Sequence, residues 1–162
     1  MITKQRIDEL FTYRDGMFFH KAIRRGVPVA GVEAGTWSNT DGYKYINIDN
    51  KRYPTHRIVF FYHNEYFPQE VDHIDGNRTN NIPSNLRAAN HTENMYNCTK
   101  HSSNTTGIKG VYWNDNSNSY HARIRIGNGK RISIGYFKDI KDAEIAINNA
   151  RKQFHGEFAR AA

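Results

Sequence analysis

Cysteine is nearly absent from this sequence of 162 residues, which contains a single one, Cys98. One cysteine excludes a disulfide within the chain and any zinc site with several cysteine ligands. Long apolar runs are also absent: no stretch suits a membrane span, and the opening MITKQRIDEL lacks the apolar core of a signal peptide. We therefore expect a soluble protein of the cytoplasm, with Cys98 as a small packing residue.

Acidic residues are the scarcer charged class, with 16 Asp and Glu against 23 Lys and Arg, a formal net charge of +7. The excess is uneven. Residues 1–97 hold 12 basic and 11 acidic side chains, and residues 98–162 hold 11 and 5, so +6 of the +7 lies in the second part. A one-sided basic excess is typical of a protein that binds a polyanion.

The first seventy residues predict a short helix followed by strands. The helix is expected at TKQRIDELF, and Asp49-Asn50 suits a tight turn between two strands. The apolar run HRIVFFYHN fits either a short helix or a buried strand, because periodicity does not separate the two. The predicted strands are GMFFHK, GYKYINI and the start of KRYPTHRIVFF.

A polar linker at 98–107 separates this part from a second domain at 108–160. Three strand patterns, KGVYW, YHARIRI and KRISIGYF, precede one helical pattern, KDIKDAEIAINNARKQFHG. The pattern predicts a three-stranded antiparallel sheet packed on one helix, an α+β fold. The apolar face of the sheet is expected at Val111, Ala122, Ile124, Ile126, Ile132 and Ile134, and that of the helix at Ala143, Ile147, Ala150 and Phe154.

Residues 71–97, VDHIDGNRTNNIPSNLRAANHTENMYN, place an acid beside a histidine and follow them with many asparagines. The pattern predicts a strand, a loop, a second strand and a helix capped by Asn90 or Thr92. On that helix Asn94 is well placed to meet Asp72. A carboxylate and an amide oxygen are hard ligands that suit Mg²⁺ or Mn²⁺.

His73 is the natural base for an attacking water, since neutral imidazole accepts a proton near neutral pH. Asn85 is suited to brace the loop between the two strands through its side-chain amide. A solvated polar loop without a metal is the alternative that these residues leave open.

The same stretch resembles the HNH nuclease motif of the His-Me finger, or ββα-metal, group. It is most similar to the form found in phage homing endonucleases. The resemblance rests on DHIDGN, the NN at 80–81, the NLR at 85–87 and ENMYN. It implies a ββα-metal nuclease fold within residues 1–97.

The resemblance also implies roles for individual residues. His73 matches the general base, Asp72 matches a metal ligand, and Asn85 matches the middle, structural position of the catalytic motif. The last position is a metal ligand that is often His in the family, and here it is Asn94, a variant known in the phage group. His91 is therefore a rival ligand.

Four more residues near the motif are candidates for phosphate contacts. The segment YPTHRIVFFYHNEYFPQEVDHIDGN resembles the region that precedes the motif in phage proteins, in which His56 and Arg57 match a recurrent pair. Arg78 and Arg87 flank the motif. The alternatives are packing for His56 and Arg57 and a solvated face for the two other arginines.

The second domain resembles the ERF-type (APETALA-type) DNA-binding domain of plant transcription factors, which also occurs fused to phage HNH nucleases. The pieces KGVYW, HARIRI, RISIGYF, DAEIAINNA and HGEFA carry the resemblance. Strand alternation already places three arginines on one face, which suits DNA phosphates and guanine edges or an ordinary basic solvent face. The resemblance implies DNA contacts at Lys109, Tyr112, Asn114, Arg123, Arg125, Arg131 and Ser133, but several family positions differ, so base specificity does not carry over.

The sequence as a whole predicts a Mg²⁺-dependent DNA endonuclease of the phage homing type. We expect it to act as a monomer on double-stranded DNA, without an obligate protein partner, and to cut one strand per visit. The alternative from another class is a DNA-binding regulator with an inactive nuclease fold. An RNA-directed nuclease or a colicin-like toxin is a further alternative, and the ERF-like sheet favours duplex DNA over RNA.

Overall fold

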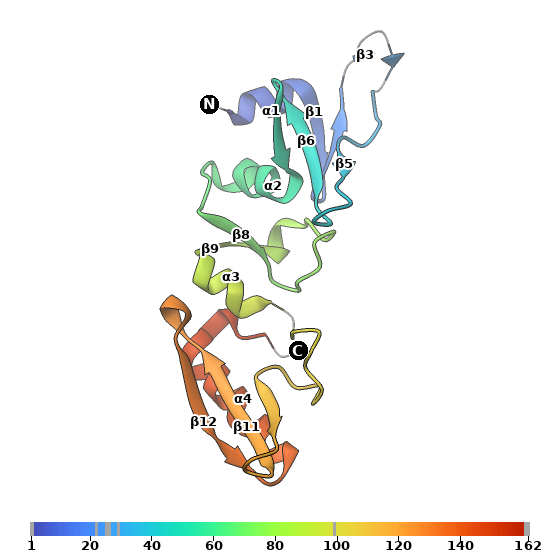
Figure 1. Cartoon of the computed structure of the whole chain (residues 1–162). Coiled ribbons are helices and arrows are strands. Elements are labelled where there is room, and N and C mark those ends of the chain that lie inside the picture. Colours follow the sequence, from blue (N-terminus) through green and yellow to red (C-terminus); the bar gives the residue numbers. More distant parts are fainter. Residues whose placement is uncertain (1, 22, 25–26, 29, 99, 161–162) are drawn as a thin grey trace. The chain divides into compact units, whose positions relative to one another are not determined.

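The computed structural model describes residues 2–21, 23–24, 27–28, 30–98 and 100–160. It forms two compact units, Met1–Ala89 and Asn90–Ala162, here called the N-terminal and C-terminal units. Helices and antiparallel strands occur in both (Figure 1), so the predicted mixture of α and β structure is confirmed. The predicted linker at 98–107 follows the unit boundary and includes residue 99, which lies outside the described residues; the predicted domain limits stay a prediction.

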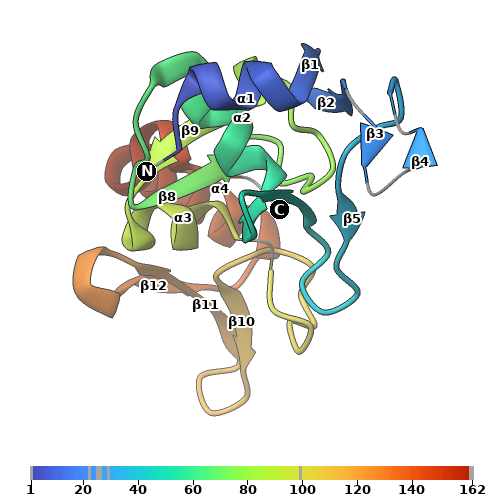
Figure 2. The same cartoon turned by 90° about the horizontal axis from the view of Figure 1, so that it is seen from above.

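The N-terminal unit begins with helix α1 (Lys4–Leu10), whose first turn is capped by the Thr3 side chain. A hairpin follows, and Figures 1 and 2 show it directly after α1. The strands of this unit before the second helix are β1 (Phe11–Arg14), β2 (Met17–His20), β3 (Ile23–Arg24), β4 (Val27–Pro28), β5 (Thr36–Trp37), β6 (Lys44–Ile48) and β7 (Lys51–Pro54).

The turn between β6 and β7 forms as predicted. Asp49 and Asn50 both have positive φ, at 47° and 63°, and Ile48 pairs with Lys51 across the turn. Asparagine and aspartate tolerate this left-handed region better than other residues with a side chain. The short turn fixes the register that brings β6 and β7 together.

The apolar run that fits either structure is a helix, α2 (Thr55–Asn64). It contacts β6 and β7 on one side and strands β8 (Glu70–His73) and β9 (Leu86–Ala89) on the other (Figure 1). Burial from two sides explains why the sequence has a continuous apolar run rather than one stripe. The core of this unit comprises Ile7, Phe11, Phe18, Ala34, Ile46, Ile48, Ile58, Val59, Phe60, Phe61, Val71 and Leu86.

The β8–β9 hairpin contains the first two elements of the predicted motif. The strands are antiparallel, with Asp72 opposite Arg87 and His73 opposite Leu86. A loop that ends in the short 3₁₀ helix η1 (Pro83–Asn85) joins them. The last residues of β8 and the loop that follows them contain the candidate site described below.

The C-terminal unit contains helix α3 (His91–Asn97), a three-stranded antiparallel sheet and helix α4 (Ile140–His155). Asn90 caps α3 and forms a capping box with Glu93, one of the two caps that the sequence left open. The sheet has the order β10 (Val111–Asn114), β11 (Ser119–Arg125), β12 (Arg131–Phe137); short 3₁₀ turns lie at η2 (Gly127–Gly129) and η3 (Gly156–Phe158).

One face of this sheet packs on α4. Val111, Ala122 and Ile124 are buried against the helix, with Ile126, Ile132, Ile134 and Phe137 partly buried around them. On the helix the predicted positions Ala143, Ile147 and Ala150 are buried, but Phe154 is 41% exposed, so its assignment to the core is wrong. The buried stripe instead continues at four-residue steps from Ile147 to Arg151 and His155, as helix geometry allows.

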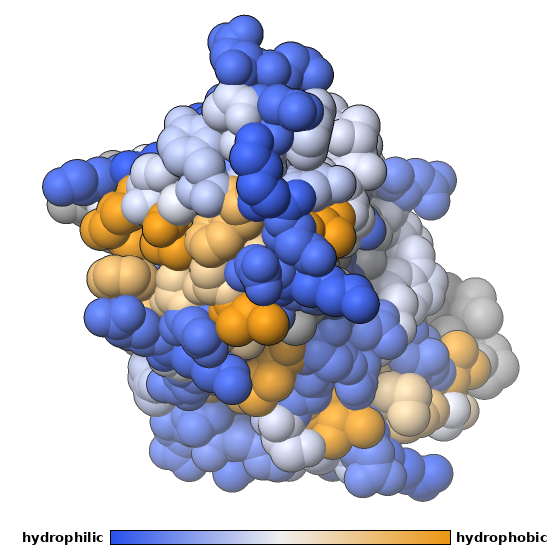
Figure 3. Space-filling model, turned by 90° about the horizontal axis from the view of Figure 1, so that it is seen from below, coloured by the Kyte–Doolittle hydropathy of each residue, from blue (hydrophilic) through white to orange (hydrophobic). Residues whose placement is uncertain are grey.

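The structure also bears on two smaller expectations, the one for Cys98 and the one for membrane spans. Cys98 is exposed, so its interpretation as a packing residue is wrong: it follows the last residue of α3, where the chain leaves the helix. Within the described residues, no helix is long and apolar enough to cross a membrane. The surface in Figure 3 is mostly hydrophilic, with separate apolar areas.

Candidate active site

The acid and histidine of the motif are the last two residues of β8. Both are buried, at 5% and 4% exposure. Asp72 lies opposite Arg87 on β9, and its Oδ2 accepts hydrogen bonds from Nε and Nη2 of that arginine at 2.9 and 2.8 Å. The antiparallel register thus forms a buried ion pair, in which a guanidinium compensates the carboxylate.

His73 is oriented by an asparagine of the joining loop. The ring Nε2 lies 2.9 Å from Oδ1 of Asn81, and an amide oxygen only accepts hydrogen bonds. Nε2 therefore carries the hydrogen, and in the neutral ring Nδ1 carries the lone pair. In this tautomer Nδ1 is the ring nitrogen that can accept a proton.

Two further rings pack around His73. The His56 ring centroid lies 5.0 Å from that of His73, and the Tyr43 ring lies 4.7 Å from His56 and 6.1 Å from His73. Burial and repulsion from His73 lower the pKa of His56 to about 3. His56 is thus neutral at ordinary pH, and it adds no positive charge against a proton taken up by its neighbour.

The asparagine-rich loop is held by its own side chains around Asp75. Asn85 accepts from the Asp75 amide at 3.0 Å and donates to the Asp75 carboxylate at 2.9 Å and to the Asn80 carbonyl at 2.8 Å. Burial opposes the ionised acid, but hydrogen bonds from Asn80, Asn77 and Asn85 hold the pKa of Asp75 below its usual value. The brace expected of Asn85 is therefore present; a part in catalysis stays a prediction.

The β1–β2 turn supports the same loop. Gly16 has φ of +84°, and a Cβ placed there would lie 2.4 Å from the carbonyl oxygen of Asn81. Only glycine allows both that backbone conformation and that approach. The close contact holds the backbone of the residue whose side chain orients His73.

The four predicted phosphate contacts have partners within the N-terminal unit. His56 is buried in the ring cluster, and Arg87 pairs with Asp72. Arg57 donates to the carbonyl oxygens of Gln69 and Pro68, at 3.0 and 2.9 Å. Arg78 donates to the carbonyl of Asp41 at 2.6 Å and lies 4.9 Å from the centroid of the Tyr43 ring. Contact with phosphate stays a prediction for each of them.

The remaining predicted ligand positions are on α3 of the C-terminal unit. Asn94 is half-buried and lies one turn after the cap. Its backbone N–H donates to the backbone carbonyl of Asn90 at 3.0 Å. His91 is the first residue of the helix and is exposed. The pairing of Asn94 with Asp72, and the rival role of His91, stay predictions.

Metal binding depends on a small set of protein donors. Across the described part of the chain, no group of three or more His, Cys, Asp and Glu side chains is arranged to hold a metal ion. The predicted set has one carboxylate, Asp72, and one amide, Asn94. These hard oxygens fit Mg²⁺ or Mn²⁺, which takes its other ligands from water and phosphate.

The predicted DNA-binding residues surround the open face of the C-terminal sheet. Arg125 lies directly opposite Arg131, and both are exposed. Like charges at opposed positions destabilise a sheet, by up to roughly 1 kcal/mol. Arg123 lies over the Tyr112 ring, at 4.5 Å from its centroid. An open sheet face with these charges is therefore suited to an anionic partner.

The other three predicted contacts are engaged inside the unit. Ser133 bonds to the His121 ring at 2.9 Å, and the Asn114 side chain accepts from the amide of Ser117 at 3.2 Å. Lys109 donates to the carbonyl oxygens of Tyr96 and Cys98 at the end of α3. A contact of any of these with DNA stays a prediction.

Sequence reasoning assigned no role to Asn81 or Tyr43. Asn81 is half of the NN pair at 80–81, and a histidine that is predicted to be a base is expected to have an orienting partner, so the sequence indicated that some asparagine would orient it. The sequence could not say which one, because the loop holds several. Tyr43 looked like the start of a strand, and its contact with His73 depends on how β6 packs against β8 through α2.

Replacing Asn81 with alanine is expected to lower the rate of DNA cleavage about 10–100-fold, the usual effect of removing a partner that orients a site residue. The ring of His73 then loses the acceptor that selects its tautomer. Asn81→Asp keeps an acceptor and should cut at close to the wild-type rate. Asn47→Ala, which removes the side chain of an exposed asparagine on β6, outside the loop, is the control. Initial rates of plasmid nicking measure the effect, and an unchanged rate for Asn81→Ala would count against the orienting role.

Comparisons with known proteins cover the segment that contains this site. Residues 53–96 match the family model described as HNH endonuclease. Protein 3.8 of Escherichia phage T7 is 34% identical over 90 residues, which cover 56% of this chain and 73% of that protein. An uncharacterized HNH endonuclease of Acanthamoeba polyphaga mimivirus is 27% identical over 168 aligned residues, covering 97% of this chain and 87% of the viral protein. No solved structure matches the chain. The matched segment contains the β8–β9 hairpin with its buried acid, oriented histidine and braced loop, and the chain belongs to the HNH endonuclease family of DNA nucleases.

Proposed function

We propose that this nuclease hydrolyses phosphodiester bonds of duplex DNA with His73 as the general base and with a divalent cation held by Asp72 and Asn94. The observation that carries the proposal is the buried pair at the end of β8. There a carboxylate is ion-paired with Arg87, and a histidine is fixed in one tautomer by Asn81. In a solvated polar loop the side chains of Asp72 and His73 would be exposed to water and would not be held in one orientation.

The reaction begins with a proton transfer. Nδ1 of His73 takes a proton from water, and the water oxygen attacks the phosphorus atom. The bond to the 3′ oxygen breaks, and that oxygen takes a proton from solvent water, which leaves a 5′ phosphate and a 3′ hydroxyl, the products that the family resemblance implies. His73 then returns its proton to solvent. Asn81 holds the ring in place as it becomes positively charged, and neutral His56 beside it does not oppose that charge. Asn85 keeps the loop in the shape that presents Asn81.

A bound Mg²⁺ or Mn²⁺ would supply stabilisation of the negative charge that develops on the phosphate and the leaving oxygen. Asp72 and Asn94 are the proposed ligands. Nε and Nη2 of Arg87 both donate to Oδ2 of Asp72, and this pairing keeps the buried acid compensated by a positive charge.

The C-terminal sheet is proposed to hold the DNA. The opposed Arg125 and Arg131, together with Arg123 over Tyr112, give its open face a concentration of positive charge. This assignment also rests on the resemblance to ERF-type domains, which bind DNA through the same face of a three-stranded sheet. Phosphates compensate such charges, and short antiparallel sheets enter the major groove.

The biological setting proposed is homing, in which a phage-encoded nuclease acts in the host cytoplasm on a specific site. One active site per chain implies that a monomer nicks one strand, and that full cleavage takes two encounters. The named relatives come from a phage and a giant virus, which supports a viral setting.

A test of the proposed function is the incubation of supercoiled plasmid and phage genomic DNA with the protein in Mg²⁺, in Mn²⁺ and in excess EDTA. Open circles or discrete fragments are expected with either ion and not with EDTA. Cleavage that persists in EDTA would contradict the metal proposal. DNA bound tightly but never cut, with either ion, would instead support a DNA-binding regulator.

A further inference from the structure

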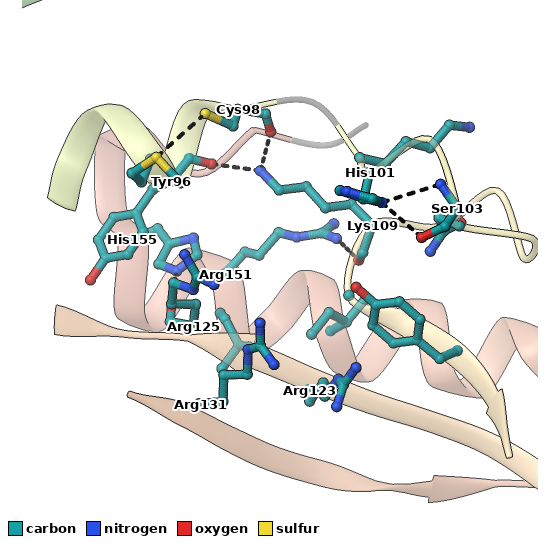
Figure 4. Close-up of a pocket in the computed structure, with 17 residues that line it drawn as sticks. Tyr96, Cys98, His101, Ser103, Lys109, Arg123, Arg125, Arg131, Arg151 and His155 are labelled. Carbon is teal, nitrogen blue, oxygen red and sulfur yellow. Dashed lines mark hydrogen bonds between the residues drawn. The ribbon is translucent and has the colours of Figure 1, made fainter. Parts of the chain in front are cut away.

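The C-terminal unit contains a basic pocket between the end of α3, the chain at 100–110, the sheet and α4 (Figure 4). Its volume is about 450 Å³. Among the described residues seventeen line it, and none of them is an aspartate or a glutamate. Six of them are Lys or Arg: Lys100, Lys109, Arg123, Arg125, Arg131 and Arg151.

Two of these cations are taken out of water without a salt bridge, although the charge of Glu144 acts on Arg151 from beyond salt-bridge distance. Arg151 is 5% exposed, and it donates to the backbone carbonyl of Lys109 and, at 2.7 Å, to the side-chain oxygen of Asn148. Lys109 is half-buried and donates to two backbone carbonyls. Neither forms an ion pair with any residue that the structure describes. Buried charges are ordinarily paired, so this arrangement leaves a positive charge to be compensated by something else.

The two cations also repel one another. Burial and the charge of Arg151 lower the pKa of Lys109 to about 8, and burial lowers the pKa of Arg151. A bound anion would reverse both effects. Figure 4 shows Arg123, Arg125 and Arg131 rising from the strands toward the same space.

A histidine in the wall of the pocket adds a second polar group. His155 is 8% exposed and stacks on Tyr96 with ring centroids 3.7 Å apart. Its Nε2 donates to the carbonyl oxygen of Arg125 at 2.7 Å, so Nδ1 of the neutral ring is an acceptor. That buried Nδ1 has no hydrogen-bond partner within the described structure. It suits a ligand that offers a hydroxyl as well as negative charge.

We propose that this basic pocket binds a phosphate group of the nucleic-acid substrate, together with part of the attached nucleotide. The cations carry the phosphate specificity. The volume lies within the range of small-ligand sites, which leaves room for more than a bare phosphate. The inference rests on the proposed DNA-binding role of the C-terminal unit, and it adds Lys100, Arg151 and His155, which lie outside the predicted sheet contacts.

The test compares three variants that each remove one positive charge. Arg151→Gln and Lys100→Gln alter the pocket, one deep inside it and one at its exposed rim. Lys152→Gln is the matched control, because Lys152 is an exposed neighbour on α4 that does not line the pocket. Affinity for a labelled 24-base-pair duplex is measured at several salt concentrations. Each pocket variant is expected to lower the slope of log affinity against log salt by roughly one, and the control should match the wild type.

Backbone NMR spectra of the whole chain give a second measurement and check that each variant is folded. Duplex DNA should shift the backbone amide signals of Gly110 and Ser103, which line the pocket. Separate titrations with inorganic phosphate and with thymidine 5′-monophosphate test whether the pocket instead binds a free phosphate or nucleotide. Unchanged slopes and unshifted pocket amides, with DNA still bound, would overturn the pocket and leave the proposed function intact. If the mononucleotide shifted the pocket amides and DNA did not, the pocket would bind a free nucleotide, and the proposal that it binds a phosphate of the DNA substrate would be wrong. Failure of the wild type to bind DNA would count against the proposed function itself.

Discussion

Replacing His73 with alanine is expected to lower the rate of DNA cleavage by about 10²–10⁴-fold, the usual contribution of a general base. The expectation follows from the fixed ring. Nε2 donates to Asn81, so Nδ1 is the ring nitrogen that takes the proton in the proposed reaction. Without the imidazole no oriented base remains at the end of β8. The nicking rate of supercoiled plasmid at saturating protein measures the loss.

Binding of DNA should survive this change. The open sheet face that we propose to bind DNA belongs to the C-terminal unit, and His73 is buried in the N-terminal unit. We therefore expect the affinity for duplex DNA to stay within about twofold of wild type, since the substitution leaves the basic side chains of the sheet face unchanged. Loss of cleavage together with binding would indicate unfolding rather than a missing base.

Two controls separate the base from a structural histidine. His63→Ala removes an exposed histidine of α2 and should leave the rate unchanged. Added imidazole should restore part of the activity of His73→Ala, because a small base can enter the space left by the ring. Full activity of His73→Ala without imidazole would remove His73 from the mechanism, and failure of imidazole to rescue it would weaken the assignment as base.

The sequence predicted those parts of the fold that depend on neighbouring residues. The Asp49-Asn50 turn and the Asn90 cap both formed where local chemistry placed them. Each depends on the residues within one turn of it. The helix at 55–64 could not be distinguished from a strand, because its burial from two sides is set by hairpins that are distant in sequence.

The sequence predicted which residue types the site contains, but not which side chains pair with one another. Asp72 and His73 stand out as neighbours, and the family resemblance gives them roles. The ion pair of Asp72 with Arg87 depends on the register between β8 and β9, and the choice of Asn81 over its neighbours depends on the path of the loop. The same reason explains Arg151. A helix pattern marks it as a surface charge, and only packing against the end of α3 and the sheet buries it.

Replacing Asp72 with asparagine is expected to abolish tight binding of a divalent ion and to lower cleavage by at least about 10²-fold. Asparagine has nearly the same shape and keeps one oxygen, so the change removes the negative charge with little effect on packing. A neutral amide binds Mg²⁺ or Mn²⁺ far less well than a carboxylate. Titration of Mn²⁺, followed by the loss of the free-ion signal in electron paramagnetic resonance, measures binding without reference to activity.

The same substitution also breaks the buried ion pair, so stability has to be separated from metal binding. Asp72 and Arg87 have side-chain exposures of 5% and 13%, and removing one partner of a buried pair costs about 3–5 kcal/mol of unfolding free energy. Arg87→Met removes the other partner and is the matched variant. It should be destabilised by a comparable amount in urea unfolding, yet it keeps the carboxylate and should still bind Mn²⁺. If Asp72→Asn bound Mn²⁺ as the wild type does, the carboxylate would not be a ligand. If both variants lost Mn²⁺ binding, the ion pair itself would be required for the metal site, because Asp72 would then bind the ion only when Arg87 holds it in position.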